Sequence, residues 1–177
     1  MKISNHWLEP AQQLSSPNAD SRPEPGAISL IVLHCISLPP GEFSSDCIDR
    51  LFTNTLDENA HPYFGMISHL KVSAHVLIRR DGRIIQYVPF NGRAWHAGAS
   101  AFEGQLQCND FSIGIELEGT ETAAYTESQY GCLSEVLAAL IETYENLNWG
   151  RIAGHSDVAP ARKTDPGPSF DWSRIGR

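Results

Sequence analysis

The spacing of apolar positions changes along this chain, and each spacing predicts a different kind of element. Residues 29–36 form a short β-branched run that ends before a Pro-Pro-Gly turn, which is typical of a buried central strand. Residues 111–117 form a second apolar run and predict a further buried strand. A final short strand is expected at residues 151–154, directly before His155.

Two other stretches predict a hairpin and one long helix. Residues 72–79 and 83–88 flank an Asp-Gly dipeptide, which favours a tight turn between antiparallel strands. From Thr126 onward the apolar residues recur at helical spacing, and Thr126 with Gln129 resembles a capping box at the start of that helix. The apolar stripe of this helix is expected to pack in the core.

These elements together predict one domain that covers residues 1–177. Residues 1–27 are rich in Pro, Ser, Asn and Asp, so we expect an irregular N-terminal lead-in packed on the surface. Strands, a hairpin and one long helix indicate a mixed α/β fold in which a single central mixed β-sheet is flanked by helices.

Composition excludes several classes of function. The net charge of -8 disfavours a nucleic-acid partner, because clustered Lys and Arg drive binding to phosphates. The most apolar segment, residues 28–38, is shorter than the roughly 20 residues that a membrane span needs. The N-terminus does not read as a secretory signal, and the four cysteines form no C-x-x-C pair. We therefore expect a cytoplasmic protein with reduced thiols, no membrane association and no obligate protein partner.

Two histidines and one aspartate are the candidate metal ligands. His34 lies inside the first apolar strand, where a hydrogen-bonded core histidine is an alternative interpretation. His155 follows the last predicted strand, and Asp165 lies ten residues later in a loop rich in Pro and Gly. Two imidazoles and a carboxylate with an open fourth position are typical of catalytic zinc. The long spacing between them is not diagnostic by itself.

Acidic and basic side chains near these positions are candidates for proton transfer and charge stabilisation. Glu116 and Glu118 share one face of an apolar strand. Burying a carboxylate there costs folding free energy unless it is hydrogen-bonded, paired with a cation or retained for catalysis. Either could act as a general base, although a salt bridge is the alternative for Glu118. Lys163 could stabilise an oxyanion, the alternative being a solvated loop lysine.

An aromatic residue and an imidazole, Trp95 and His96, precede Ala97-Gly98 and suit the wall of a sugar or peptide groove. We therefore predict that Trp95 and His96 bind substrate. His75 could be a hydrogen-bond partner of a metal ligand, but a place in the hydrophobic core is the preferred interpretation.

Six short motifs are distributed along the chain. They are Val32-Leu33-His34, Val72-Ser73-Ala74-His75, Arg80-Asp81-Gly82, Trp95-His96-Ala97-Gly98, residues 109–116, and Gly154-His155-Ser156-Asp157 through residues 163–168. Together they resemble the zinc N-acetylmuramoyl-L-alanine amidases, the family that includes phage lysozyme-like amidases and peptidoglycan recognition proteins. The resemblance is strongest to the cytoplasmic AmpD-type branch, which recycles 1,6-anhydromuropeptides, and it extends from about residue 6 to the C-terminus.

The resemblance implies a specific chemistry for the candidate residues. His34, His155 and Asp165 would be zinc ligands, Glu116 the general base, and Lys163 the cation that polarises the carbonyl group. The implied reaction is zinc-dependent hydrolysis of the amide between the lactyl group of an anhydromuramyl sugar and L-alanine. It belongs to peptidoglycan recycling, and it carries an indirect role in β-lactamase regulation where the host has that circuit.

Two positions depart from the family pattern. Ala74 stands where the phage branch has a tyrosine, which shifts proton transfer onto Glu116. Cys35 stands where the AmpD-type branch commonly has asparagine, and its thiol is a weaker hydrogen-bonding group.

Two rival functions are weighed against hydrolysis. A peptidoglycan-fragment sensor that binds without cutting would be expected to lack the third metal ligand, whereas Asp165 is present. A zinc peptidase of another class would be expected to carry H-E-x-x-H, which does not occur in the sequence.

Overall fold

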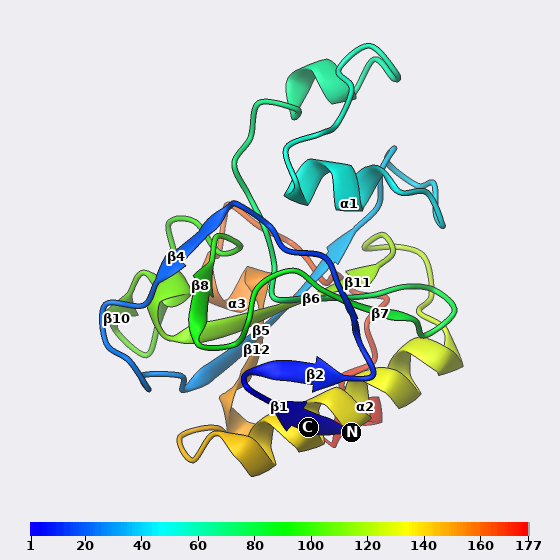
Figure 1. Cartoon of the computed structure of the whole chain (residues 1–177). Coiled ribbons are helices and arrows are strands. Elements are labelled where there is room, and N and C mark those ends of the chain that lie inside the picture. Colours follow the sequence, from blue (N-terminus) through cyan, green and yellow to red (C-terminus); the bar gives the residue numbers. More distant parts are fainter. Residues whose placement is uncertain (177) are drawn as a thin grey trace.

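A six-stranded mixed sheet forms the centre of the protein, whose computed structural model describes residues 1–176 (Figure 1). The spatial order is β12-β5-β11-β6-β7-β3. In that order the strands are Ile152–Gly154, Leu30–Ile36, Ser112–Glu118, Val76–Ile78, Ile84–Gln86 and Gln12–Gln13. The first four are mutually parallel, β6 and β7 form the antiparallel hairpin predicted around the Asp-Gly turn, and β3 runs parallel to β7. The predicted mixed sheet is therefore confirmed.

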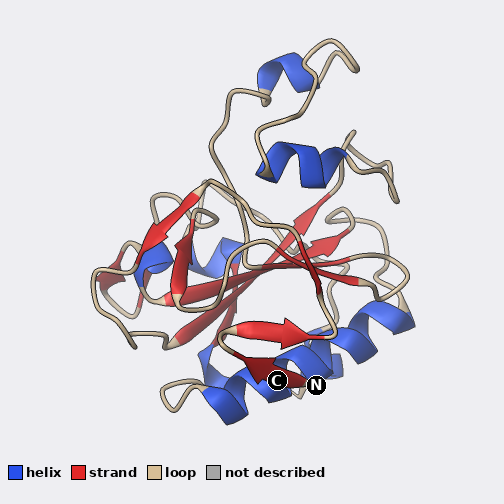
Figure 2. Cartoon of the chain, in the orientation of Figure 1, coloured by secondary structure: helices blue, strands red, loops and turns tan. Residues whose placement is uncertain are grey.

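Within residues 1–176, three α-helices and four short 3-10 helices accompany the sheet (Figure 2). The α-helices are α1 (Cys47–Phe52), α2 (Glu127–Thr143) and α3 (His155–Val158). The 3-10 helices are η1 (Phe64–Met66), η2 (Cys108–Asp110), η3 (Trp149–Arg151) and η4 (Trp172–Ile175). The capping box at the start of α2 is present, since the Thr126 side chain accepts from the Gln129 N–H and the Gln129 side chain accepts from the Thr126 N–H. None of the helices in residues 1–176 combines the length and apolar character that crossing a membrane requires.

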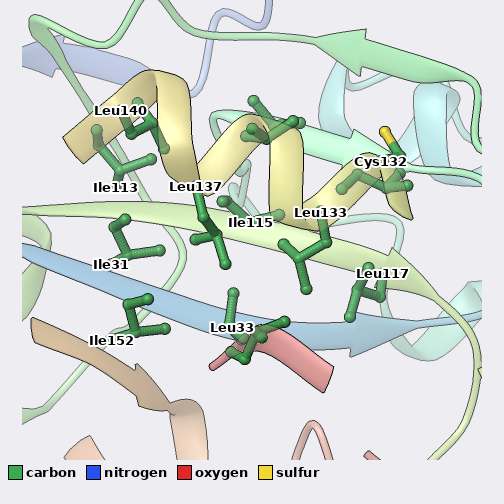
Figure 3. Packing of buried hydrophobic residues seen from close by; sticks show 14 of the residues in the cluster. Ile31, Leu33, Ile113, Ile115, Leu117, Cys132, Leu133, Leu137, Leu140 and Ile152 are labelled. Carbon is green, nitrogen blue, oxygen red and sulfur yellow. The ribbon is translucent and has the colours of Figure 1, made fainter. Parts of the chain in front are cut away.

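The long helix α2 covers one face of the sheet and closes the main hydrophobic core. Figure 3 shows Leu133, Leu137 and Leu140 of α2 against residues of β5 and β11. The strand residues that face α2 occupy alternate positions: Ile31, Leu33, Ile113, Ile115 and Leu117. Since strand side chains alternate between faces, the intervening positions of β5 and β11 must point to the other side.

The opposite face of the sheet is covered by shorter elements. Residues of α1 pack there with Leu77 of β6 and Ile85 of β7. On the same face, β4 (Ala19–Ser21) pairs with β8 (Gly92–Ala94), and β9 (Ala101–Phe102) pairs with β10 (Gln105–Leu106). This face carries the polar side chains described below.

The N-terminal segment differs from the prediction. Residues 1–27 were expected to be irregular, but they contain four short strands, including β1 (Lys2–Ser4) and β2 (Trp7–Glu9), which pair with each other. The segment is also not confined to the surface, because Asn18 is 2% exposed and Arg22 is 5% exposed. Strands of two or three residues are too short to show a hydrophobic period, so the Pro and Ser content dominated the interpretation.

Candidate metal centre

Parallel pairing of β5 and β11 places the first two candidate residues next to each other. The register sets Glu116 directly beside His34, and both occupy the alternate positions that point away from α2. Gly114, two residues before Glu116, leaves room above the sheet for the ring of His96. A Cβ at position 114 would lie 2.4 Å from the His96 ring, so only glycine allows this close approach.

The other candidate ligands arrive from the neighbouring strand and its following loop. Strand β12 pairs with β5, and His155 begins α3 directly after β12 ends (Figure 1). Asp165 lies in the subsequent loop, which folds back so that the Ser156 N–H donates to the Asp165 carbonyl at 2.9 Å. The hydroxyl of Tyr125 donates to the carbonyl of Pro166 at 2.8 Å and holds the same loop.

Three potential ligand atoms converge at this point. Nδ1 of His34 lies 2.9 Å from Nδ1 of His155, and these nitrogens lie 3.2 Å and 3.1 Å from Oδ2 of Asp165. Both imidazoles are nearly fully buried, and the Asp165 side chain is 13% exposed. No fourth ligand from His, Cys, Asp or Glu is grouped with them in residues 1–176. The donor set fits a catalytic zinc ion, which takes His nitrogen and carboxylate oxygen and leaves a position open.

The outer nitrogens of both histidines have hydrogen-bond partners of their own. His155 Nε2 lies 3.2 Å from the Ala97 carbonyl, which accepts only, so Nε2 carries the proton. His34 Nε2 lies 2.9 Å from Nδ1 of His96, and His96 Nε2 lies 3.3 Å from the Ser112 hydroxyl. If His34 donates to His96, both ligand histidines present an unprotonated Nδ1 to the site, as metal binding requires.

The electrostatic environment favours neutral rings of His34 and His96 and an ionised Asp165. Burial lowers the pKa of His34 to about 4, and it lowers the pKa of His96 well below its ordinary value. Burial alone would raise the pKa of Asp165, but hydrogen bonds with His155 and His34 bring it below the ordinary range. Neutral histidine and ionised aspartate are the forms that bind a metal.

Glu116 is the one buried carboxyl group at the site whose oxygen has no protein partner. Its Oε2 is fully buried and makes no hydrogen bond to the described residues. Burial raises the pKa of Glu116 well above its ordinary value, the nearby Asp165 raises it further, and Lys163 lowers it. A carboxyl group in this state is suited to accepting and returning a proton.

Glu118 has a different role, and the salt-bridge alternative describes it correctly. Its Oε1 lies 3.0 Å from Arg79 and accepts from the Ser44 N–H at 2.7 Å. Arg79 also binds Asp49 of α1 at 2.9 Å. Glu118 thus ties the segment that carries α1 to the end of β11, and its carboxylate is fully occupied.

A cavity of about 730 Å³ opens over the candidate ligands. The charged residues that line the cavity include Lys163, which is exposed, Arg162 and Glu121. Trp95 and His96 line it as well, so their predicted place in a groove wall agrees with the structure, while their contact with substrate stays a prediction. The apolar residues that line the cavity include Leu51, Phe52, Tyr63, Ile67 and Leu70.

The structure also places Cys35 and His75, whose positions could not be decided from the sequence. Cys35 lines the cavity, and burial raises the pKa of its thiol to about 12, so it stays protonated. His75 lies in the core: it accepts from the Gly114 N–H at 3.0 Å, and its Nε2 lies 3.1 Å from the Gly92 carbonyl. Ala97 and Asn109 stand inside motifs found in the sequence, but no role was predicted for either. In the structure they support the site through a backbone carbonyl and a side-chain amide.

Comparison with known proteins gives consistent matches over most of the chain. A family model described as N-acetylmuramoyl-L-alanine amidase matches residues 24–168. The 1,6-anhydro-N-acetylmuramyl-L-alanine amidase AmpD of Citrobacter freundii is 59% identical over 175 residues, which cover 99% of this chain and 93% of that protein.

Solved structures extend the comparison to the fold and to a substrate complex. A crystal structure of a selenomethionine derivative of AmpD has a TM-score of 0.97 at 58% identity and covers 99% of this chain and 98% of its own. The Escherichia coli amidase AmiD was solved with the substrate anhydro-N-acetylmuramic acid-L-Ala-D-γ-Glu-L-Lys. Its structure has a TM-score of 0.63 at 28% identity, and the match covers 89% of this chain and 59% of the AmiD chain. The amidase fold expected from the sequence motifs is therefore confirmed.

Proposed function

This chain belongs to the N-acetylmuramoyl-L-alanine amidase family, and from that premise we propose that it is a zinc-dependent AmpD-type amidase of peptidoglycan recycling. Its reaction is hydrolysis of the amide between the lactyl group of a 1,6-anhydro-N-acetylmuramyl sugar and L-alanine. The observation that carries the zinc dependence is the convergence of His34, His155 and Asp165 beside the unpartnered carboxyl oxygen of Glu116.

The proposed metal ligands are Nδ1 of His34, Nδ1 of His155 and Oδ2 of Asp165. When bound, a zinc ion in a site of this kind supplies Lewis acidity that polarises an amide carbonyl and makes a water molecule more acidic. The three side chains contribute one negative charge in total, which suits a divalent cation while leaving the site electrophilic.

Glu116 is the proposed carrier of the proton. Its carboxylate accepts a proton from the attacking water and returns it to the nitrogen of the departing alanine. The raised pKa of the buried Glu116 brings its proton affinity closer to that needed for both steps. Because Glu118 is held by Arg79, Glu116 performs this task alone on its strand.

Trp95 and His96 are the proposed contacts for the sugar or peptide on one wall of the groove. The aromatic face of Trp95 provides apolar contact area with a polar N–H at its edge, which suits a substrate that carries both methyl and amide groups. We place the reaction in the cytoplasm, a proposal supported by four free cysteines.

Lys163→Ala is expected to retain the metal and lose roughly 3 kcal/mol of transition-state stabilisation, as deletion of an oxyanion donor often does. The exposed Lys163 ammonium is free to approach the carbonyl oxygen on which negative charge develops. Single-turnover cleavage and metal content measure the two quantities. Lys71→Ala removes another lysine outside the groove lining and serves as the control. Loss of metal from Lys163→Ala, or unchanged cleavage, would contradict the assigned role.

The proposed function is tested by incubating the protein with intact 1,6-anhydromuramyl tripeptide and identifying products by mass spectrometry. We expect the free anhydro sugar and the free tripeptide, with a new carboxylate on the lactyl group. A sample stripped of metal with a chelator is the matched control, and added zinc should restore cleavage. Binding without cleavage in the zinc-loaded protein would indicate a sensor, and cleavage at another bond would indicate a different hydrolase.

A further inference from the structure

Arg22 is a buried cation that the proposed reaction does not use. It lies directly after β4 and is 5% exposed. Burial lowers its pKa to about 10, which still leaves it charged at neutral pH. It also lies before residue 24, where the match to the amidase family model begins. A buried charge must be hydrogen-bonded or paired, so the hydrogen-bond partners of Arg22 indicate its role in the structure.

Five backbone carbonyl contacts surround the Arg22 guanidinium. Its Nη2 also lies 3.1 Å from Nε2 of His75, but His75 accepts from the Gly114 N–H through Nδ1, so in the neutral ring Nε2 carries a proton and is no acceptor for Arg22. Nη1 donates to the carbonyls of Asn109 and Asp110, each at 3.1 Å. Nη2 donates to the carbonyls of Ser112 at 2.8 Å and Phe90 at 3.1 Å, and Nε donates to Phe90 at 3.3 Å. The five N–H groups of the guanidinium therefore all have carbonyl acceptors. One side chain joins η2, the start of β11 and the turn before β8.

The same segments hold the residues behind the metal centre. The side-chain oxygen of Asn109 accepts from the backbone N–H groups of His96 and Ala97, at 3.2 Å and 2.8 Å. The hydroxyl of Ser112 lies 3.3 Å from Nε2 of His96. His96 is thus fixed at its backbone and at its ring by two residues whose own carbonyls bind Arg22.

Residues 96–97 in turn contact both ligand histidines. Nδ1 of His96 lies 2.9 Å from Nε2 of His34, and the Ala97 carbonyl lies 3.2 Å from Nε2 of His155. These partners orient the rings and determine which nitrogen faces the metal. A shift of the Asn109 segment would therefore move the supports of both ligand histidines together.

We infer that Arg22 is a positioning residue of the metal centre, acting through Asn109 and Ser112 on His96 and Ala97 and so on His34 and His155. The inference rests on the proposed metal site. It assigns to a segment outside the matched family domain a part in setting metal affinity. Lysine cannot replace Arg22, because a single ammonium cannot bridge carbonyls on three segments as a planar guanidinium does.

The test compares Arg22→Lys with the unaltered protein by zinc affinity, measured in competition with a chelator. We expect the affinity to fall about tenfold or more, since loss of outer partners of metal ligands typically costs 10–100-fold. Nitrogen chemical shifts of the His34 and His96 rings should show a changed proton distribution. Asn109→Ala should give a loss of similar size, and the double variant should lose little more than either single variant, because both act along one path.

Arg151→Met is the matched control, because Arg151 also donates to a backbone carbonyl, that of Ser29 at 2.7 Å directly before β5, but its side chain binds Ser29 and Glu103 rather than the residues that hold His96 and Ala97. It should lower thermal stability without lowering zinc affinity. Arg22→Met tests the effect of removing every donor, and its unfolding temperature separates global destabilisation from loss of metal. Zinc affinity of folded Arg22→Lys within twofold of the unaltered protein, or the same loss in Arg151→Met, would overturn the inference. Absence of zinc binding in the unaltered protein would instead overturn the proposed function.

Discussion

Glu116→Gln is expected to reduce turnover by about 100-fold or more while retaining zinc and substrate binding, the scale typical of losing a general acid–base group. The amide has nearly the shape of the carboxylate but cannot accept the proton from water. Single-turnover cleavage, metal content and binding of the anhydromuropeptide measure the three effects. The buried, unpartnered Oε2 of Glu116 makes the substitution conservative for the fold, because no protein hydrogen bond to that oxygen is lost.

Glu118→Gln is the matched control for this prediction. It changes the carboxylate two residues further along the same face, where Arg79 and two backbone N–H groups occupy it. Its main effect should be lower stability, since Arg79 would lose a buried partner. Near-normal turnover in Glu116→Gln would move the proton carrier elsewhere, with His96 the next group to test, and it would leave the zinc assignment intact.

Asp165→Ala is expected to lose both zinc and activity, in contrast to Glu116→Gln. Removing a ligand weakens coordination itself, and it also takes away the charge that draws a divalent cation to two neutral imidazoles. Zinc content after dialysis, together with cleavage measured at saturating zinc, distinguishes weakened binding from lost chemistry. Asp171→Ala removes a carboxylate that caps η4, outside the cavity lining, and should keep its metal.

Chelation of the unaltered protein should reproduce the Asp165→Ala result reversibly. Activity should disappear as zinc is removed and return when zinc is added, because the ligands come from a preformed and largely buried arrangement. Full activity in a sample verified as metal-free would eliminate the proposed mechanism, whatever the behaviour of the variants.

Local signals in the sequence predicted the parts of the fold that depend on neighbouring residues. The capping box of Thr126 and Gln129 and the Asp-Gly turn both concern contacts within a few positions, and both are present. The β-branched run at residues 29–36 reads as a buried strand because its composition leaves few alternatives. Predicted strand 72–79 is shorter in the structure, at Val76–Ile78, because residues 73 and 75 bond to Trp95 and Gly114 outside a regular ladder.

The site depends on contacts that no local pattern encodes. That Glu116 lies beside His34 follows from the parallel register of β5 and β11, which only the assembled sheet determines. The motifs suggested the three ligand candidates, but their convergence needed the loop that returns Asp165 to His155. Arg22 could not be identified from sequence at all, because its partners are backbone carbonyls more than 60 positions away.

The two faces of the sheet divide the molecule in a way that matters for engineering. Alternate positions of β5 and β11 send Ile31 and Ile115 into the packing against α2, and send His34 and Glu116 into the cavity. Redesign of the α2 interface could therefore raise heat tolerance without touching the chemistry. The cavity face offers the opposite freedom, since α1 and its adjoining loops could be varied to change which stem peptides are accepted while the core packed against α2 remains undisturbed.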